Sequence, residues 1–173
     1  MACGSVRVLG VDQSLTCSGL ALVCSGRVER VWSLKPKMRG NERLRLIVSS
    51  VLEAAQGVDV VVVEGPSMHS QGRSLVQLYG LFTLLTYSLW VAGVRTVVVP
   101  PTVRAMYATG RGNANKDAVL LSVARRYPNV DVQDNNQADA LAMAALVCRA
   151  LGEPVAGETV PQAALRAVDR LEV

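Results

Sequence analysis

The stretch VDVVVVEG, residues 58–65, decides the fold. Its continuous apolar run is typical of a strand that is covered on both faces of a sheet. The earlier stretch VRVLGVD, residues 6–12, has the same character, and the two runs end on acidic residues, Glu64 and Asp12. If the two strands are parallel and close, their carboxyl ends point at one spot, where α/β sheets commonly bind ligands. The sequence therefore predicts a polar site at one edge of an apolar sheet.

Further strands are predicted on both sides of this stretch. Apolar runs indicate strands over residues 19–24, 27–34 and 94–100. Ser25 and Gly26 fit a tight hairpin turn, so the first three strands are expected to form an antiparallel meander. Gly19 is expected to allow a close backbone approach just after the first strand.

Helices are predicted between and after the strands. Apolar residues repeat at three and four between Asn41, a plausible N-cap, and Gly57, a plausible stop. Four more helices are predicted over residues 74–94, 100–110, 117–126 and 136–151. The order of elements predicts a mixed five-stranded α/β sheet, a meander followed by right-handed crossovers and flanked by helices.

Composition fits one compact domain. The 173 residues are 50% apolar and 18% charged, which excludes a disordered chain, and the net charge of +4 permits nucleic-acid binding without demanding it. We expect a domain over residues 1–151, followed by a linker and a short helix or tail over residues 152–173. Four cysteines without a CxxC pattern and a single histidine argue against zinc.

One uncharged segment has the length of a membrane span. Residues 74–94 carry no charge but include Gln77, Thr83 and Thr86, and they run straight into a strand pattern. A buried helix, partly at a subunit interface, is therefore predicted instead, and no membrane contact. The N-terminus lacks the pattern of a signal peptide, so the expected location is the cytoplasm.

Acidic residues at the ends of buried strands need partners. Asp12 and Glu64 are expected to meet Asp139, which opens a late helix, and three converging carboxylates repel each other by roughly 4 kcal/mol per pair at ~4 Å. Divalent cations relieve this repulsion, and oxygen ligands favour Mg²⁺ or Mn²⁺. Two such ions at one site can promote water attack on a phosphodiester.

The same motifs resemble a known family. The stretches VLGVDQSLTCSGLAL, VVVVEGP, GNANKDAV and NNQADALAMA are similar to the motifs of RuvC-type Holliday junction resolvases, which belong to the RNase H-like superfamily. The resemblance covers roughly residues 6–150. It implies a homodimeric endonuclease that cuts four-way DNA junctions with Mg²⁺ or Mn²⁺, in a bacterial or virus-infected bacterial cell.

The resemblance also implies roles for single residues. Asp12, Glu64 and Asp139 match the metal-binding acids, and Lys116 matches a catalytic lysine. A fourth acid or a histidine is usual where this chain has Asn136, so either Asn136 or Asp134 is expected to complete the metal site.

DNA contacts are expected from two groups of residues. The loop after Glu64 matches one that approaches the junction centre, and basic residues elsewhere fit either a phosphate track or a merely soluble face. The residues concerned are Met68, His69, Arg73, Arg104, Arg111 and Lys116.

Two other functions fit parts of the sequence. The change to Asn136 is compatible with a junction-binding protein that has weak or no nuclease activity. The turn DQSLTCSG also fits an actin-like nucleotide-binding protein, but such proteins need a second, duplicated domain, for which 173 residues leave no room.

Overall fold

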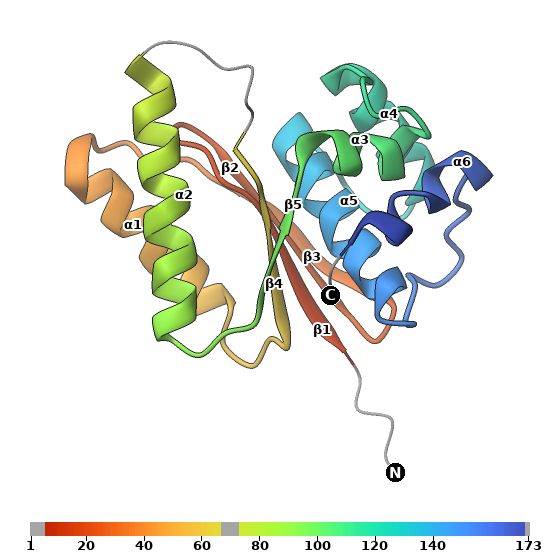
Figure 1. Ribbon diagram of the computed structural model, residues 1–173, viewed down its shortest axis with the longest axis horizontal. Coiled ribbons are helices and arrows are strands. Elements are labelled where there is room, and N and C mark those ends of the chain that lie inside the picture. The colour runs from red at the N-terminus through yellow and green to blue at the C-terminus, as the bar shows by residue number, and fades with distance from the viewer. Residues whose placement is uncertain (1–5, 67–72, 172–173) are drawn as a thin grey trace.

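The computed structural model describes residues 6–66 and 73–171, except for the side chains of residues 73 and 74 (Figure 1). Five strands form one sheet in the order β3-β2-β1-β4-β5. The strands are β1 Arg7–Asp12, β2 Ser18–Cys24, β3 Arg27–Leu34, β4 Val60–Glu64 and β5 Thr96–Val99. The helices are α1 Gly40–Ala54, α2 Arg73–Val91, α3 Pro101–Thr109, α4 Lys116–Arg126, α5 Asn135–Ala150 and α6 Gln162–Leu165, with a 3₁₀ turn, η1, at Val168–Arg170.

The sheet is mixed, as predicted. β1 pairs antiparallel with β2, and β2 with β3, whereas β1, β4 and β5 are parallel to one another. The β2–β3 turn consists of Ser25 and Gly26, whose φ angles of 51° and 68° suit a tight hairpin. One predicted detail is wrong: Asn41 does not cap α1, because the helix begins at Gly40 and its N-cap, Arg39, makes no side-chain capping bond.

Two layers of helices cover the sheet. Figure 1 shows α1 and α2 on one face and α3 to α6 on the other. Alternate residues of each central strand enter opposite cores: Val60 and Val62 of β4 pack on the α5 side, whereas Val61 and Val63 pack on the α1 and α2 side. A central strand buried on both faces explains why its sequence is continuously apolar.

Two glycines let α5 lie directly on the sheet. A Cβ atom on Gly10 of β1 would come within 2.1 Å of the Ala140 carbonyl oxygen, and one on Gly19 of β2 within 2.0 Å of the Asn136 carbonyl oxygen. No side chain fits at such distances. The close approach predicted at Gly19 is therefore present, and Gly10 makes a second one. Together they bring the start of α5 next to the end of β1.

The C-terminal segment packs on the helical layer up to its last described residue. Val155 and Ala167 are buried in the core shared by α3, α4 and α5, and Ala164 is buried as well. The carboxylate of Glu158 accepts hydrogen bonds from the hydroxyls of Tyr107 and Tyr127. Residues 152–171 thus cover part of the helical layer.

Helix α2 is apolar on its exposed face as well as its buried one. Leu81, Leu85 and Leu89 are fully buried against α1 and the sheet. The exposed face carries Val76, Leu84, Tyr87, Trp90 and Val91. Within the described ranges, no helix has the length and apolarity needed to cross a membrane.

Candidate active site at the carboxyl edge of the sheet

Three carboxylates from separate elements converge beyond the ends of the central strands. Asp12 is the last residue of β1, and Glu64 is the last of the parallel neighbour β4, one step past the paired Val11 and Val63. Asp139 lies on α5, which packs against β1 and β2. Asp12 and Glu64 line a cavity of about 400 Å³. The structure therefore brings together the three acids that the sequence predicts as partners.

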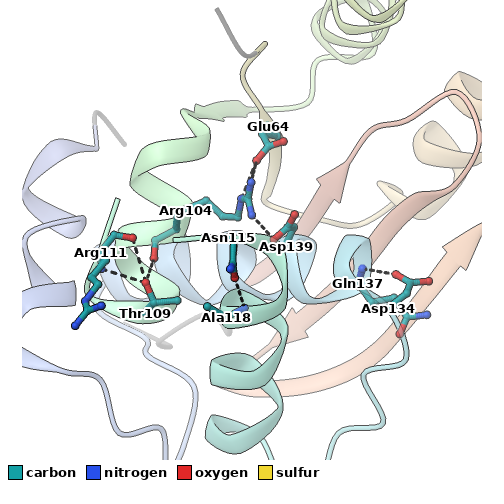
Figure 2. A network of polar contacts seen from close by, with 10 residues as sticks. Glu64, Arg104, Thr109, Arg111, Asn115, Ala118, Asp134, Gln137 and Asp139 are labelled. Atoms are coloured by element: carbon teal, nitrogen blue, oxygen red, sulfur yellow. Dashed lines mark hydrogen bonds and ion pairs between the residues drawn. The ribbon is translucent and has the colours of Figure 1, made fainter. Parts of the chain in front are cut away.

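The guanidinium of Arg104 lies between two of these acids (Figure 2). Its Nε donates to Oε1 of Glu64 at 2.7 Å, and its NH2 group forms an ion pair with the same oxygen at 2.7 Å. Its NH1 group donates to Oδ1 of Asp139 in a very short contact. Arg104 is only 8% exposed, so these ion pairs are largely shielded from water.

Negative charge accumulates at this edge in spite of Arg104. Burial, followed by the nearby charges of Glu64 and Asp139, raises the pKa of Asp12 well above its usual range. Burial also raises the pKa of Asp139 to about 6, although Arg104 and Lys116 oppose the shift. Burial alone would lower the pKa of Arg104, but the three carboxylates raise it, so the guanidinium stays charged.

The donor set suits a hard divalent cation. Carboxylate oxygens are the ligands that Mg²⁺ and Mn²⁺ prefer, and Asn136, which also lines the cavity, offers an amide oxygen. Burial, followed by the charges of Glu64 and Asp139, raises the pKa of Asp12, and a cation bound beside it would favour its ionised form. Within the described residues, however, no three acidic, histidine or cysteine side chains are arranged to hold an ion as they stand. Arg104 already occupies the space between Glu64 and Asp139.

Lys116 lies at the rim of the same cavity. It is the first residue of α4, and it is exposed. The side chain of Asn115 caps this helix by accepting a hydrogen bond from the Ala118 backbone N–H at 2.8 Å. The cap fixes where α4 begins and holds Lys116 beside the acids, where its charge favours the ionised forms of Asp12 and Asp139.

Asp134 serves α5 as its N-cap. It accepts hydrogen bonds from the Gln137 backbone N–H at 2.9 Å and the Ser33 hydroxyl at 2.7 Å. Burial would raise its pKa, but these hydrogen bonds lower it overall. Asp134 is not among the cavity-lining residues, whereas Asn136 is. Of the two residues predicted to complete the metal site, Asn136 is therefore the one placed at the cavity.

The predicted DNA-binding residues lie in different surroundings. Arg111 is exposed on the loop before α4 and points away from the acids in Figure 2. Arg104 is buried among the acids instead of lying on the surface. Met68 and His69 fall outside the described residues, as does the side chain of Arg73.

Gln13 is a site residue that sequence reasoning missed. Its Nε2 donates to the Glu64 backbone carbonyl at 2.6 Å and so ties the ends of β1 and β4 together. Its Oε1 is buried without a hydrogen-bond partner among the described residues, and Gln13 lines the cavity. Its position directly after Asp12 was the available signal, because the residue after a strand end is well placed to reach the neighbouring strand.

The fold is shared with solved structures of RuvC and of a viral resolvase. No protein-family model and no curated protein matches this sequence. The chain is similar to Thermus thermophilus RuvC, with a TM-score of 0.68 and 23% identity over 86% of this chain and 98% of that one. It is also similar to T. thermophilus RuvC in complex with a Holliday junction substrate, with a TM-score of 0.65 and 24% identity over 80% and 90% of the two chains.

A viral protein gives a more distant match. Fowlpox virus resolvase, solved with its substrate Holliday junction DNA, has a TM-score of 0.59 and 10% identity over 84% of this chain and 99% of that one. These structures confirm the predicted RNase H-like fold, a five-stranded mixed sheet flanked by helices, and the predicted likeness to RuvC.

Proposed function

We propose that the protein is a metal-dependent endonuclease that cuts four-way or otherwise branched DNA. The observation that carries the proposal is the convergence of Asp12, Glu64 and Asp139, from two parallel strands and a helix. Asp12 and Glu64 line one cavity with Lys116 at its rim, and the charge of Asp139 acts on Asp12. The similar solved structures include two bound to Holliday junctions, which makes such junctions the first substrate to test.

Each residue has a distinct part in the proposed reaction. Asp12, Glu64 and Asp139 are the candidate ligands for Mg²⁺ or Mn²⁺, with Asn136 as a neutral fourth ligand. A bound divalent ion would activate water for attack on the phosphodiester and stabilise the charge that develops on the phosphate. Lys116 is placed to pair with a phosphate oxygen, because its charged group is exposed beside the acids.

Two features suit a large anionic substrate. The chain carries 18 basic and 14 acidic residues, and three of those acids are turned inward at the cavity, so the outer surface is more basic than the net charge of +4 indicates. The exposed position of Arg111 on the loop before Lys116 makes it a second candidate for a phosphate contact.

We propose further that the active protein is a homodimer joined through α2. Trp90 is 74% exposed, Val76 is 75% exposed, and both lie on the apolar outer face of this helix. A monomer rarely exposes such a stripe, whereas a dimer buries it. Size-exclusion chromatography with light scattering should give twice the chain mass, and Trp90→Glu should shift the protein toward the monomer.

Cleavage of a labelled four-way junction tests the nuclease proposal. The protein should nick the junction with Mg²⁺ or Mn²⁺, and EDTA should abolish the nicking without abolishing binding. A linear duplex of the same sequences should be cut much more slowly. Absence of nicking with either metal on any branched substrate would refute the proposal.

A second candidate function is junction binding with little or no turnover. It is favoured by Arg104, which already neutralises part of the charge that would attract a metal. Tight binding of the junction without nicking at any Mg²⁺ or Mn²⁺ concentration would select this function over the nuclease.

A further inference from the structure

We propose that Arg104 is the second cation of the site, so that each chain binds a single divalent ion while the guanidinium stays between Glu64 and Asp139. The inference rests on the proposed metal-dependent function. It differs from the expectation of two ions drawn from the sequence, and it gives Arg104 a role at the reacting centre instead of on a DNA-binding surface.

Arg104 is held in place from several directions. It lies in the first turn of α3, where its backbone N–H donates to the Pro100 carbonyl at 3.1 Å. Its Nε and both terminal nitrogens contact carboxylate oxygens. The planar fork of a guanidinium suits bridging between two carboxylates. Because Arg104 is only 8% exposed, water could not replace these contacts if they broke. The bridge is therefore a built part of the site.

The contacts of Arg104 leave oxygens for one metal ion. They engage Oε1 of Glu64 and Oδ1 of Asp139. A carboxylate has two oxygens and about four acceptor sites, so the other oxygens, together with Asp12, can still bind a cation. An ion on the Asp12 side of the cluster does not require Arg104 to leave.

The charges of the site balance with one ion. Asp12, Glu64 and Asp139 carry three negative charges when ionised, and Arg104 and Lys116 supply two positive ones. One divalent ion and one phosphodiester then give an assembly that is neutral overall. A second divalent ion would leave two positive charges in a low-dielectric pocket, an arrangement that Coulomb repulsion disfavours.

The remaining lining residues add no carboxylate for a second ion. Asp12 and Glu64 are the acids among the described residues that line the cavity, and Asn136 is neutral. Asp134, the N-cap of α5, accepts hydrogen bonds from the Gln137 backbone N–H and the Ser33 hydroxyl and does not line the cavity. Arg104 thus supplies the positive charge that these ligands cannot obtain by binding a second metal ion.

Counting bound ions in the full chain tests the inference. Mn²⁺ binding is measured by isothermal titration calorimetry and by the electron paramagnetic resonance signal of free Mn²⁺, without DNA. Arg104→Gln removes the charge, Arg104→Lys keeps it, and Arg27→Gln is the matched control on an exposed arginine away from the acids. Circular dichroism and thermal melting establish that each variant is folded, and Arg104→Lys covers the case in which Arg104→Gln fails to fold.

One ion per chain is expected for the wild type, for Arg27→Gln and for Arg104→Lys. Arg104→Gln is expected to bind a second ion, or to bind the first roughly tenfold tighter or more, because a competing positive charge a few ångströms away has gone. Weaker binding by Arg104→Lys than by the wild type also supports the bridge, because an ammonium cannot hold both carboxylates in place.

Two results would overturn the inference while leaving the nuclease proposal intact. One is two ions of similar affinity per wild-type chain. The other is a folded Arg104→Gln variant whose stoichiometry and affinity equal those of the wild type. If no variant binds Mn²⁺ at all, the metal-dependent function itself fails, and the inference fails with it.

Discussion

Two arginine–carboxylate clusters lie on the side of the sheet that α3, α4 and α5 cover, and they differ in how their charges balance. In the first, Arg104 bridges Glu64 and Asp139 with Asp12 beside them, so acids outnumber the arginine. In the second, Arg149 pairs with Glu158, one base with one acid.

The carboxylate of the second cluster is also shielded from water and fully hydrogen-bonded. The Glu158 carboxylate is 1% exposed and accepts hydrogen bonds from Tyr107 at 3.0 Å, Tyr127 at 2.5 Å and the Arg149 Nε at 3.0 Å. The first cluster opens on a cavity of about 400 Å³. A saturated, neutral cluster joins helices to the C-terminal segment, whereas an acid-rich cluster beside a cavity is suited to bind a cation.

The largest expected effect is on cleavage by the first cluster. Asp12→Asn keeps the shape of the side chain but removes a charge needed for the metal, so junction cleavage should fall by about 10³-fold or more while junction binding persists. Single-turnover cleavage and a gel-shift titration measure the two quantities. Asp131→Asn, at an exposed acid, is the matched control and should cut normally. Normal cutting by Asp12→Asn would remove that residue from the proposed site.

The second cluster should affect stability instead of chemistry. Glu158→Ala leaves two buried tyrosine hydroxyls and the partly exposed Arg149 without their acceptor, so the free energy of unfolding should fall by about 3 kcal/mol. Urea denaturation measures it, with the exposed acid in Glu53→Ala as control. The cleavage rate of the folded variant at low temperature should be close to that of the wild type. A specific loss of cleavage without a loss of stability would contradict the structural role.

The close packing of α5 on the sheet should affect both the stability of the protein and cleavage by the first cluster. Gly10→Ala forces a methyl group against the Ala140 carbonyl, where 2.1 Å is available, and should cost about 1–3 kcal/mol or more. Because α5 carries Asp139, cleavage should also fall. Gly80→Ala on α2, where the added atom meets nothing within 4 Å, is the control. Equal stability of the two variants would show that the close approach is not required.

The burial of Asp139 in the first cluster should also give the metal-free protein a pH dependence. The folded state raises the pKa of Asp139 from 3.8 to about 6, so its contribution to stability is full below about pH 4 and is lost as the pH rises through about 6. In EDTA, the wild type should lose about 2 kcal/mol relative to Asp139→Asn between pH 4 and pH 7. Denaturant titrations across this range measure the difference, and saturating Mg²⁺ should reduce it. A constant difference between the two proteins would contradict the shift.

The sequence was sufficient to predict the sheet and to place two of the acids at the ends of its strands. Valine-rich runs that end on Asp12 and Glu64 are typical of buried strands and fit few other structures. The length of the intervening helix allows a parallel crossover between the two strands. The close approach at Gly19 was also predicted, because this glycine begins the predicted strand that follows the turn after Asp12. At Gly10 the same feature was hidden, since a glycine inside an apolar strand also fits a bulge.

The partners of charged side chains were not predictable to the same degree. Arg104 was expected among DNA contacts, but α3 turns it toward Glu64 and Asp139. Asp134 and Asn136 were interchangeable on sequence grounds, and the start of α5 at Asn135 makes one the N-cap and leaves the other at the cavity. The position at which α5 begins therefore decides the surroundings of both residues.

By itself, the sequence determined which strands are buried and where carboxylates interrupt them, because hydrophobic periodicity and strand ends are local properties of the chain. Only the tertiary structure decided which charges meet. Whether Arg104 faces solvent or two carboxylates depends on how α3, α5 and β4 pack together, and electrostatic interactions act across space between residues that are far apart in the chain.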